Sequence, residues 1–407
     1  MSKQRKISKS ILANKKTIII ILLIALIVAG YFRTTGAFWF IFTAIYLLPN
    51  FYLYNKIKKI FSRKRRRLIF TILFALLVAA LPVGEVLEHN TDSKIGNVTL
   101  WIAYYYLPVL LYTFFLYLLI DLGKASNQLL KLLPSYVFST RKFRIYSLSV
   151  ILLITAVINI AGIYNFNNTS VTSYNIEVPQ KLSKLDNMKI AVAADFHFSD
   201  HTQRSFVRQF VEKLNSIEPD IVLFPGDLIE SLPGKKKSAF IQDELGKIKA
   251  RYGIYASEGN HELYGNKKKL SFFDNTGIKF LRDTVKEKAD SFVIIGRRDR
   301  QNQERESLQT LLENTTDSLP RIVLDHQPFE LKKVSENNIN LQVSGHTHHG
   351  QLFPFQLITK AIYRISWGYK KINNTHFFVT CGAQGWGPPV KTSSYSEIME
   401  ININFTE

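Results

Sequence analysis

Long apolar stretches without charged side chains dominate the first 165 residues of the chain. Each is close to the length that crosses a hydrocarbon core of roughly 30 Å. The five stretches are Thr17–Phe32, Gly36–Tyr54, Leu68–Val83, Thr99–Ile120 and Ile145–Tyr164. A soluble protein can bury single helices of this kind, but five in one block, with the charges confined between them, are typical of membrane spans. The pattern predicts an all-α multi-pass membrane domain at residues 1–165 with about five transmembrane helices.

From residue 174 onward, the long apolar stretches give way to short apolar runs that end in polar turns. A short polar linker at residues 166–173 separates the two patterns. The runs alternate with segments such as residues 206–217, whose apolar residues recur at helical spacing. This alternation predicts an α/β domain at residues 174–407. Its polar turns follow the carboxyl ends of strands, where open sheets usually carry their sites.

Basic residues give the predicted membrane domain an orientation. The N-terminal tail carries six Lys and Arg residues, residues 55–67 carry eight and residues 121–144 carry five, whereas the alternate loops carry only Arg33 and Lys94. Loops rich in Lys and Arg stay in the cytoplasm. Five crossings therefore leave the N-terminus inside and the α/β domain on the extracytoplasmic side of the cell membrane. A cleaved signal peptide at the first stretch is the alternative, and its removal would not change this orientation.

The distribution of charge bears on the partners of the protein. The whole chain has a net charge of +20, and residues 1–165, with 21 basic and four acidic residues, contribute +17 of it. The α/β part keeps only +3, which argues against a nucleic acid as partner. The lipid bilayer is therefore the predicted partner, and no protein partner can be inferred.

Side chains that bind metal ions gather in the polar turns of the α/β part. The single cysteine, Cys381, excludes an intramolecular disulfide and a cysteine-rich zinc site. In an extended segment residues i and i+2 point the same way, so Asp195 can share an ion with His197, and His346 with His348. The turns DFH, PGD, GNHE, LDHQP and GHTHHG together offer seven candidate ligands: Asp195, His197, Asp227, Asn260, His326, His346 and His348.

Seven ligands, with Asp227 able to bridge, suffice for two divalent ions. Such a pair suits phosphoester hydrolysis, because it holds a bridging hydroxide near neutral pH and neutralises the phosphoryl oxygens. The mixed nitrogen and oxygen ligands fit Mn, Fe, Zn, Co or Ni without choosing among them. Gly226, Gly259 and Gly345 each precede a ligand, which lets the backbone come close to a crowded site.

The order DFH, GD, GNHE, H and GHTH resembles the calcineurin-like metallophosphoesterases. The closer resemblance is to their membrane-associated bacterial branch, which has GHTHGGQ where this chain has GHTHHGQ, followed by a stretch similar to GAQGWGPPVK. It covers about residues 174–403. The resemblance implies the four-layer αββα sandwich of that superfamily and a hydrolase that acts on phosphoester bonds.

The resemblance also implies roles for individual residues. One metal would be held by Asp195, His197, Asp227 and His348, and the other by Asp227, Asn260, His326 and His346. His261 would not bind metal but would act as general acid toward the leaving oxygen. Glu230, three residues after Asp227, stands where the family often has an acid.

Three residues in the last motif blocks are candidates for contact with the substrate: Trp386, Lys391 and His349. His349 stands where the branch has Gly, and Lys391 where it usually has Arg. An ordinary surface histidine and a glycine-rich packing turn are the alternatives for His349 and for the GAQGWGPP segment.

These features predict a membrane-anchored dinuclear-metal phosphoesterase. It would hydrolyse a phosphate ester, phosphodiester or pyrophosphate in a lipid-linked substrate, through a metal-bridging hydroxide with His261 as general acid. Two alternatives stay open, namely a cytoplasmic-facing pyrophosphatase of a lipid precursor and a non-catalytic metal-binding membrane protein. The substrate, the metal and the oligomeric state have no readable signature in the sequence.

Overall fold

The computed structural model describes residues 37–406 except 91–93, 135, 180–182, 265–268, 289–290, 314 and 316–318. The chain divides into two compact units. One comprises the residues up to Val78 together with Leu110–Leu152. The other comprises Ala79–Val109 and Leu153–Glu407, and it contains the whole α/β part.

Within the described part of the chain, four long helices precede the α/β part: α2 (Ala37–Ile57), α3 (Lys64–Asn90), α4 (Lys94–Leu130) and α5 (Arg141–Asn167). Two short 3₁₀ helices, η1 (Lys58–Ile60) and η2 (Val137–Ser139), lie between them. Among the described residues, three segments are long and apolar enough to cross a membrane: Lys64–Leu87, Lys94–Leu130 and Arg141–Asn167.

Three of the five predicted membrane stretches thus lie within candidate spans. The stretch Gly36–Tyr54 largely forms α2, which is not among those candidates, and Thr17–Phe32 lies outside the described residues. Five spans are therefore not confirmed, whereas a helical region with three candidate spans is.

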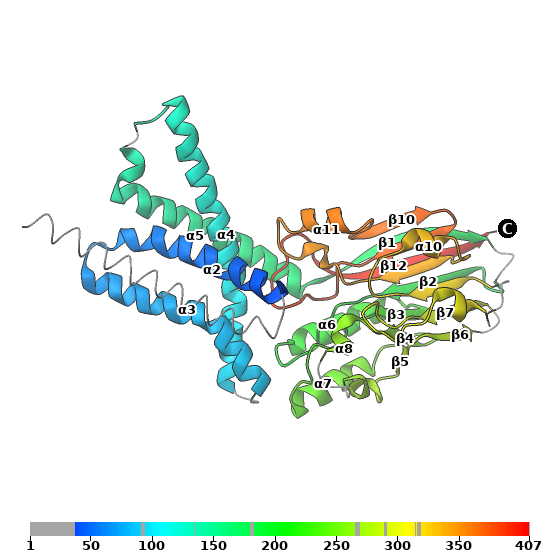
Figure 1. Cartoon of the computed structure of the whole chain (residues 1–407). Coiled ribbons are helices and arrows are strands. Elements are labelled where there is room, and N and C mark those ends of the chain that lie inside the picture. Colours follow the sequence, from blue (N-terminus) through cyan, green and yellow to red (C-terminus); the bar gives the residue numbers. More distant parts are fainter. Residues whose placement is uncertain are drawn as a thin grey trace, which may run out of the picture. The chain divides into compact units, whose positions relative to one another are not determined.

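Two six-stranded sheets form the α/β part (Figure 1). The first has the order β1 (Thr169–Pro179), β12 (Ser396–Thr406), β2 (Asn187–Val192), β3 (Ile221–Pro225), β4 (Ile254–Ser257) and β5 (Ile278–Leu281). The second has the order β10 (Gly368–Ile372), β11 (Thr375–Val379), β9 (Leu341–Ser344), β8 (Arg321–Leu324), β7 (Phe292–Gly296) and β6 (Thr284–Lys288). Strands β2 to β5 run parallel, as do β7, β8, β9 and β11.

The sheets face each other across a shared apolar core. Side chains from both, such as Leu223 and Ile322, are fully buried there. Helices α6 (Arg204–Ser216) and α7 (Lys235–Leu245) pack against the other face of the first sheet, and α9 (Leu308–Leu312) and α10 (Leu331–Ser335) against that of the second. Nearly continuous apolar runs such as IVLFP are expected for strands buried on both faces. The α/β sandwich is the architecture that the sequence predicted.

Short helices occupy the loops between these elements: α8 (Asn260–Leu263), η4 (Leu270–Phe273), η5 (His348–Gly350) and α11 (Gln356–Ile362). Two of them, α8 and η5, begin at predicted metal ligands.

The predicted linker at residues 166–173 is instead regular structure. Helix α5 continues to Asn167 and β1 begins at Thr169. Carbonyl groups in the last turn of a helix need partners from outside it, and the hydroxyl of Ser396 donates to the Phe166 carbonyl at 2.6 Å. The Asn165 amide also donates to the Lys391 carbonyl at 3.2 Å. The sandwich therefore holds the end of α5, which explains why this polar segment is ordered.

Candidate metal centre

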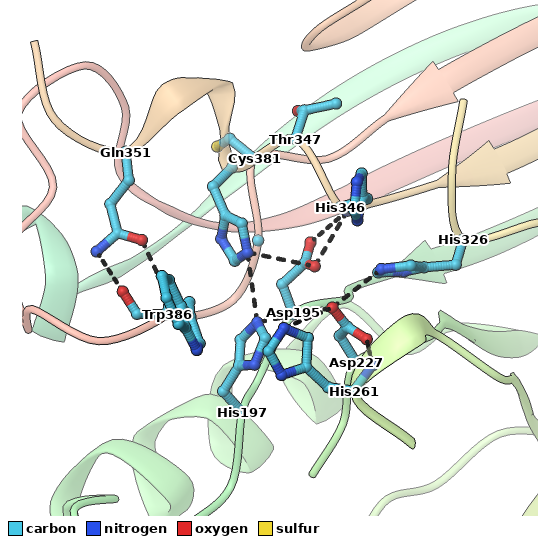
Figure 2. Close-up of polar contacts among 12 residues, drawn as sticks. Asp195, His197, Asp227, His261, His326, His346, Thr347, Gln351, Cys381 and Trp386 are labelled. Carbon is cyan, nitrogen blue, oxygen red and sulfur yellow. Dashed lines mark hydrogen bonds and ion pairs between the residues drawn. The ribbon is translucent and has the colours of Figure 1, made fainter. Parts of the chain in front are cut away.

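The predicted ligands follow the carboxyl ends of three parallel strands in the first sheet and two parallel strands in the second. Asp195, His197, Asp227, His326 and His346 point toward one another (Figure 2). Asp195 and His197 follow β2, Asp227 follows β3, and Asn260 begins α8 after β4. From the second sheet, His326 follows β8, and both His346 and His348 follow β9. Because parallel strands end at the same edge of a sheet, five separate motifs contribute to one site.

Asp195, His197 and His348 form a first group of potential metal ligands. The Nε2 atoms of the two histidines are 3.3 Å apart, and His348 Nε2 is 3.6 Å from Asp195 Oδ1. Burial, and then the neighbouring His197, lower the pKa of His348 well below its usual value. A neutral imidazole offers a free lone pair, which is the form that binds a metal ion.

Asp227, His326 and His346 form a second group. His326 Nε2 is 3.0 Å from Asp227 Oδ2, while His326 Nδ1 donates to the carbonyl of Pro225 at 2.8 Å. That hydrogen bond orients the ring so that Nε2 faces the site. Burial, with the nearby His326, lowers the pKa of His346 to about 3, so this ring, like that of His348, is neutral.

Asp227 lies between the two groups. Its Oδ2 atom is 3.0 Å from His326 Nε2 in the second group and 3.9 Å from His197 Nε2 in the first. Burial raises the pKa of this carboxyl, but the charge of His326 and the hydrogen bond to it outweigh burial and hold the pKa well below its usual range. The carboxylate therefore has the position and charge that a bridging ligand needs.

Asn260 supplies an independent sign that the donor set fits a metal ion. The side chain is buried, and its Oδ1 atom has no hydrogen-bond partner among the described residues. Leaving a buried polar atom unpaired costs about 1–3 kcal/mol. A divalent cation would satisfy this oxygen. Together with the His and Asp groups, the donors are those that borderline divalent metals accept.

Glu230 joins one predicted ligand to the predicted general acid. Its Oε2 atom is 2.9 Å from His197 Nδ1 and 2.6 Å from His261 Nδ1. Burial raises the pKa of the Glu230 carboxyl, but its hydrogen bonds to the two histidines outweigh burial and lower the pKa far below its usual value. The sequence marked Glu230 only as a position that matches the family pattern; the structure gives it a contact with both rings.

Glu262, the last residue of the GNHE motif, was not singled out from the sequence. Its buried carboxylate accepts hydrogen bonds from the backbone amides of Asp227 at 2.9 Å, Leu228 at 2.7 Å, Ile229 at 3.1 Å and Gly259 at 2.7 Å. It thereby ties the loop after β3 to the loop after β4. Its partners are backbone amides, which do not depend on residue type, so no sequence motif indicates this role.

Close backbone approach at Gly259 and Gly345 agrees with the prediction from the sequence. A β-carbon at Gly259 would lie 2.2 Å from Asp227 Oδ1, and one at Gly345 would lie 2.6 Å from Asp195 Oδ2. Both distances are far inside van der Waals contact, so only glycine fits at either position.

Five of the seven predicted ligands lie in left-handed rather than extended backbone. Five ligands have positive φ: Asp195 at 57°, His197 at 48°, Asp227 at 55°, His346 at 72° and His348 at 46°. Such values are uncommon outside glycine and cluster at functional sites. Asp195 and His197 of the DFH motif belong to the same group, whereas His346 and His348 belong to different groups, which is the division that the resemblance implies.

The three candidate substrate contacts lie in different environments. Trp386 is 49% exposed, and its ring centroid is 6.2 Å from that of His261. Gln351 holds the Trp386 backbone through hydrogen bonds of 3.0 and 3.1 Å (Figure 2). Lys391 is fully buried, and its amino group donates to the carbonyls of Cys381, Gly382 and Tyr395. His349 is buried against Ser366.

Tyr264 is a further residue beside the site that sequence reasoning did not find. It is 47% exposed, and its ring centroid is 5.4 Å from that of His261. A lone tyrosine after the GNHE motif carries no recognisable pattern.

Comparisons with known proteins agree with this site. The sequence profile of the calcineurin-like phosphoesterase family matches residues 188–350. An uncharacterized metallophosphoesterase of Campylobacter jejuni is 31% identical over 381 residues, which cover 90% of this chain and 98% of that protein. A metallophosphoesterase of Helicobacter pylori is 33% identical over 235 residues, 56% of this chain and 63% of that protein.

A transmembrane protein with a metallophosphoesterase domain from Danio rerio is 28% identical over 268 residues, which are 61% of each chain. The chain therefore spans about three fifths of the length of the Helicobacter and Danio relatives. The near full-length match to the Campylobacter protein, the family profile and the converging ligands lead to one conclusion: the chain belongs to the calcineurin-like phosphoesterases.

Proposed function

We propose that the protein is a membrane-anchored, dinuclear-metal phosphoesterase with a lipid-linked substrate. The observation that carries the proposal is the convergence of Asp195, His197 and His348 with Asp227, His326 and His346, around a carboxylate that lies between the two groups. Asn260 completes the ligand set through its unpaired oxygen. Two divalent ions held there would activate a water molecule as nucleophile and neutralise the phosphoryl oxygens.

The chain's own groups would position the leaving group and move one proton. The side chain of His261 is 15% exposed, and its Nε2 atom is 4.0 Å from Asp227 Oδ2. The ring therefore lies at the solvent-accessible edge of the site. Protonated at Nε2, it would donate to the leaving oxygen as general acid. Glu230 would hold the opposite ring nitrogen and keep this orientation. The exposed rings of Trp386 and Tyr264 flank His261, where the leaving group would lie.

The strand register supports a substrate that resides in the membrane. Helix α5, a candidate span, leads directly into the start of β1, and β12 runs parallel beside it with Thr169 opposite Ser396. Strand β2 runs antiparallel to β12, with Val192 at its end opposite Met399. The metal-ligand edge of the sheet is therefore the edge at which α5 enters.

Contacts of α4, another candidate span, support the same proposal. The ring of His201 in the loop after β2 lies 5.9 Å from that of Trp101 and 5.8 Å from that of Tyr104. Tyr104 also lies 4.0 Å from the β-carbon position of Gly387, next to Trp386. Aromatic residues at a span thus border two loops of the site, as expected for a substrate that stays attached to lipid.

Catalysis on the metal site is tested with the purified full-length protein and Mn²⁺. Bis-p-nitrophenyl phosphate should be hydrolysed, Asp227→Ala should lose both bound metal and turnover, and His261→Ala should keep the metal but lose about 10²–10⁴-fold in kcat. Wild-type turnover no faster than that of Asp227→Ala, with each borderline metal supplied, would exclude the proposal.

We further propose five crossings with the catalytic domain outside the cytoplasm, supported by the distribution of Lys and Arg among the loops. In a Cys381→Ala background, a Lys235→Cys variant should react with an impermeant thiol reagent in intact spheroplasts. Protection until the membrane is opened would favour the opposite topology and a cytoplasmic lipid-precursor pyrophosphatase.

A further inference from the structure

A cavity in the unit that does not contain the metal centre is lined by four basic side chains. It has a volume of about 180 Å³, and its basic lining residues are Lys56, Lys59, Lys124 and Arg144. They come from three elements, namely the end of α2 with η1, the second half of α4, and the first turn of α5. Convergence of cations from separate segments is unfavourable unless an anion balances them.

The acidic side chain beside this cavity does not balance these charges. Asp121 forms ion pairs with Lys56 and with Lys124, the latter at 3.2 Å, and accepts a hydrogen bond from Tyr52 at 2.7 Å. Lys59 and Arg144 have no carboxylate partner among the described residues. Four cations and one carboxylate leave a formal charge of +3 around the cavity.

The rest of the cavity wall is apolar. Tyr117, Ile120, Phe138 and Phe143 line it together with the cations, and the Lys124 amino group lies 5.6 Å from the centre of the Phe143 ring. Ile120 ends one predicted apolar stretch, and Arg144 directly precedes the next at Ile145. The cavity therefore lies where membrane-spanning sequence changes to charged sequence, which is the depth of lipid headgroups.

A ligand that matches this wall carries a phosphate group next to an apolar body. We propose that the cavity formed by Lys56, Lys59, Lys124 and Arg144 binds the phosphate group of an anionic phospholipid. Basic pockets between membrane helices are suited to such headgroups. The guanidinium group of Arg144 can hold a phosphate through two parallel hydrogen bonds, and Lys59 adds a second charge. The first turn of α5 contributes further, because the N-terminus of a helix favours an anion.

The test compares two double variants of the full-length protein in mild detergent. Lys59→Gln with Arg144→Gln removes the two cations that lack a carboxylate partner, so no internal ion pair of the described residues is lost. Arg65→Gln with Arg66→Gln is the matched control, because both residues are exposed, lie outside the cavity and change the charge equally. Elution volume and thermal unfolding confirm that each variant is folded.

Retention of lipid is then measured by native mass spectrometry after titration with phosphatidylglycerol, with phosphatidylcholine and with inorganic phosphate. The wild type and the control should retain phosphatidylglycerol at least about tenfold more tightly than phosphatidylcholine, and the Lys59/Arg144 variant should lose that preference. Equal loss in the control variant, equal binding of phosphatidylcholine, or binding of inorganic phosphate without the lipid would each overturn the proposal.

Discussion

Glu230 contacts two functional histidines through a single carboxylate oxygen. The distances are 2.9 Å to His197 Nδ1 and 2.6 Å to His261 Nδ1, so one carboxylate contacts both a predicted metal ligand and the proposed general acid. Partners behind metal ligands fix ring orientation and basicity. Glu230 is therefore a positioning residue, whose loss should affect metal binding and proton donation together.

For Glu230→Gln we expect a loss of about 10–100-fold in kcat or in metal affinity. The amide keeps the size of the side chain but removes the charge that both imidazoles face. Metal content and kcat should be measured for Glu230→Gln, His261→Ala and the double variant. If Glu230 assists proton donation through His261, the double variant at saturating metal is no slower than His261→Ala. The exposed Glu212→Gln is the control, and equal losses there would contradict the assignment.

Glu262→Ala should destabilise the catalytic domain. Four backbone amides that now donate to the carboxylate would lose their acceptor in a buried region. Each unpaired buried donor costs about 1–3 kcal/mol before relaxation or entry of water. We expect about 3 kcal/mol or more, seen as a melting temperature roughly 6–12 °C lower. Glu262→Gln should lose less, and a melting temperature unchanged in Glu262→Ala would refute this role.

Among single residues, the sequence predicted those whose chemistry is selective. With one cysteine in the chain, metal ligands must come from His, Asp, Glu and Asn, so Asp195, Asp227 and His326 could be proposed from their types and spacing. Glu262 and Lys391 act through backbone atoms, and any role of that kind depends on which loops meet in space. Lys391, a predicted substrate contact, uses its amino group for three carbonyls inside the domain.

The elements that carry the site are strands, and left-handed turns follow β2, β3 and β9. The apolar runs before DFH, PGD, GNHE, LDHQP and GHTHHG predicted β2, β3, β4, β8 and β9. The turn geometry was not predictable, because positive φ at Asp or His leaves no pattern in the sequence. Strand β12 was not predicted either, although it lies between β1 and β2 in the first sheet. Strand β12 pairs with strands more than 200 residues away in the sequence. The local periodicity of a segment does not indicate which distant segment it pairs with.

The β10–β11 hairpin contains a histidine that should make stability depend on pH. His376 pairs with Lys371 across the hairpin, and its Nδ1 lies 2.9 Å from the Tyr369 hydroxyl. Burial, and then the charge of Lys371, lower the pKa of His376 to about 4 from its usual 6.5. Between these values the unfolded chain binds the proton and the folded chain does not, so the stability present above pH 6.5 is lost as the pH falls toward 4.

Melting temperatures at pH 7 and pH 5 check this effect. The decrease in melting temperature from pH 7 to pH 5 should be smaller in His376→Gln than in the wild type. In Lys371→Gln it should be intermediate, because removing the cation raises the pKa of His376. Identical drops in all three proteins would show that this group does not contribute to acid sensitivity.

For the whole molecule, bound metal should be a major source of stability in the catalytic part. At a metal concentration 100-fold above Kd, binding to the folded state alone adds about 2.7 kcal/mol. That corresponds to a melting temperature about 5–10 °C higher for a domain of this size. Mn²⁺ should give this shift and a chelator should reverse it. Asp227→Asn, which keeps the side-chain shape, should abolish it, and a shift that persists there would indicate another metal site.

The membrane part shows what pattern and length can predict. The stretches Leu68–Val83, Thr99–Ile120 and Ile145–Tyr164 predicted the three candidate spans. The helices are longer than these stretches, and α4 continues through Asp121 and Lys124 to Leu130 because those charges pair with each other and with Lys56. An apolar run gives the minimum length of a helix, and in α4 ion pairs stabilise its continuation beyond the run.

The direct passage from α5 into β1 has a kinetic consequence. A catalytic centre on a long flexible tether would sample substrate throughout the surrounding solution. Here Phe166 and Asn165 at the end of α5 are hydrogen-bonded to the sandwich, so the metal centre cannot move far from the end of this helix. For a lipid-linked substrate, encounters would then be two-dimensional: the rate should follow the mole fraction of substrate in the bilayer and fall on dilution with inert lipid, even when the bulk concentration is constant.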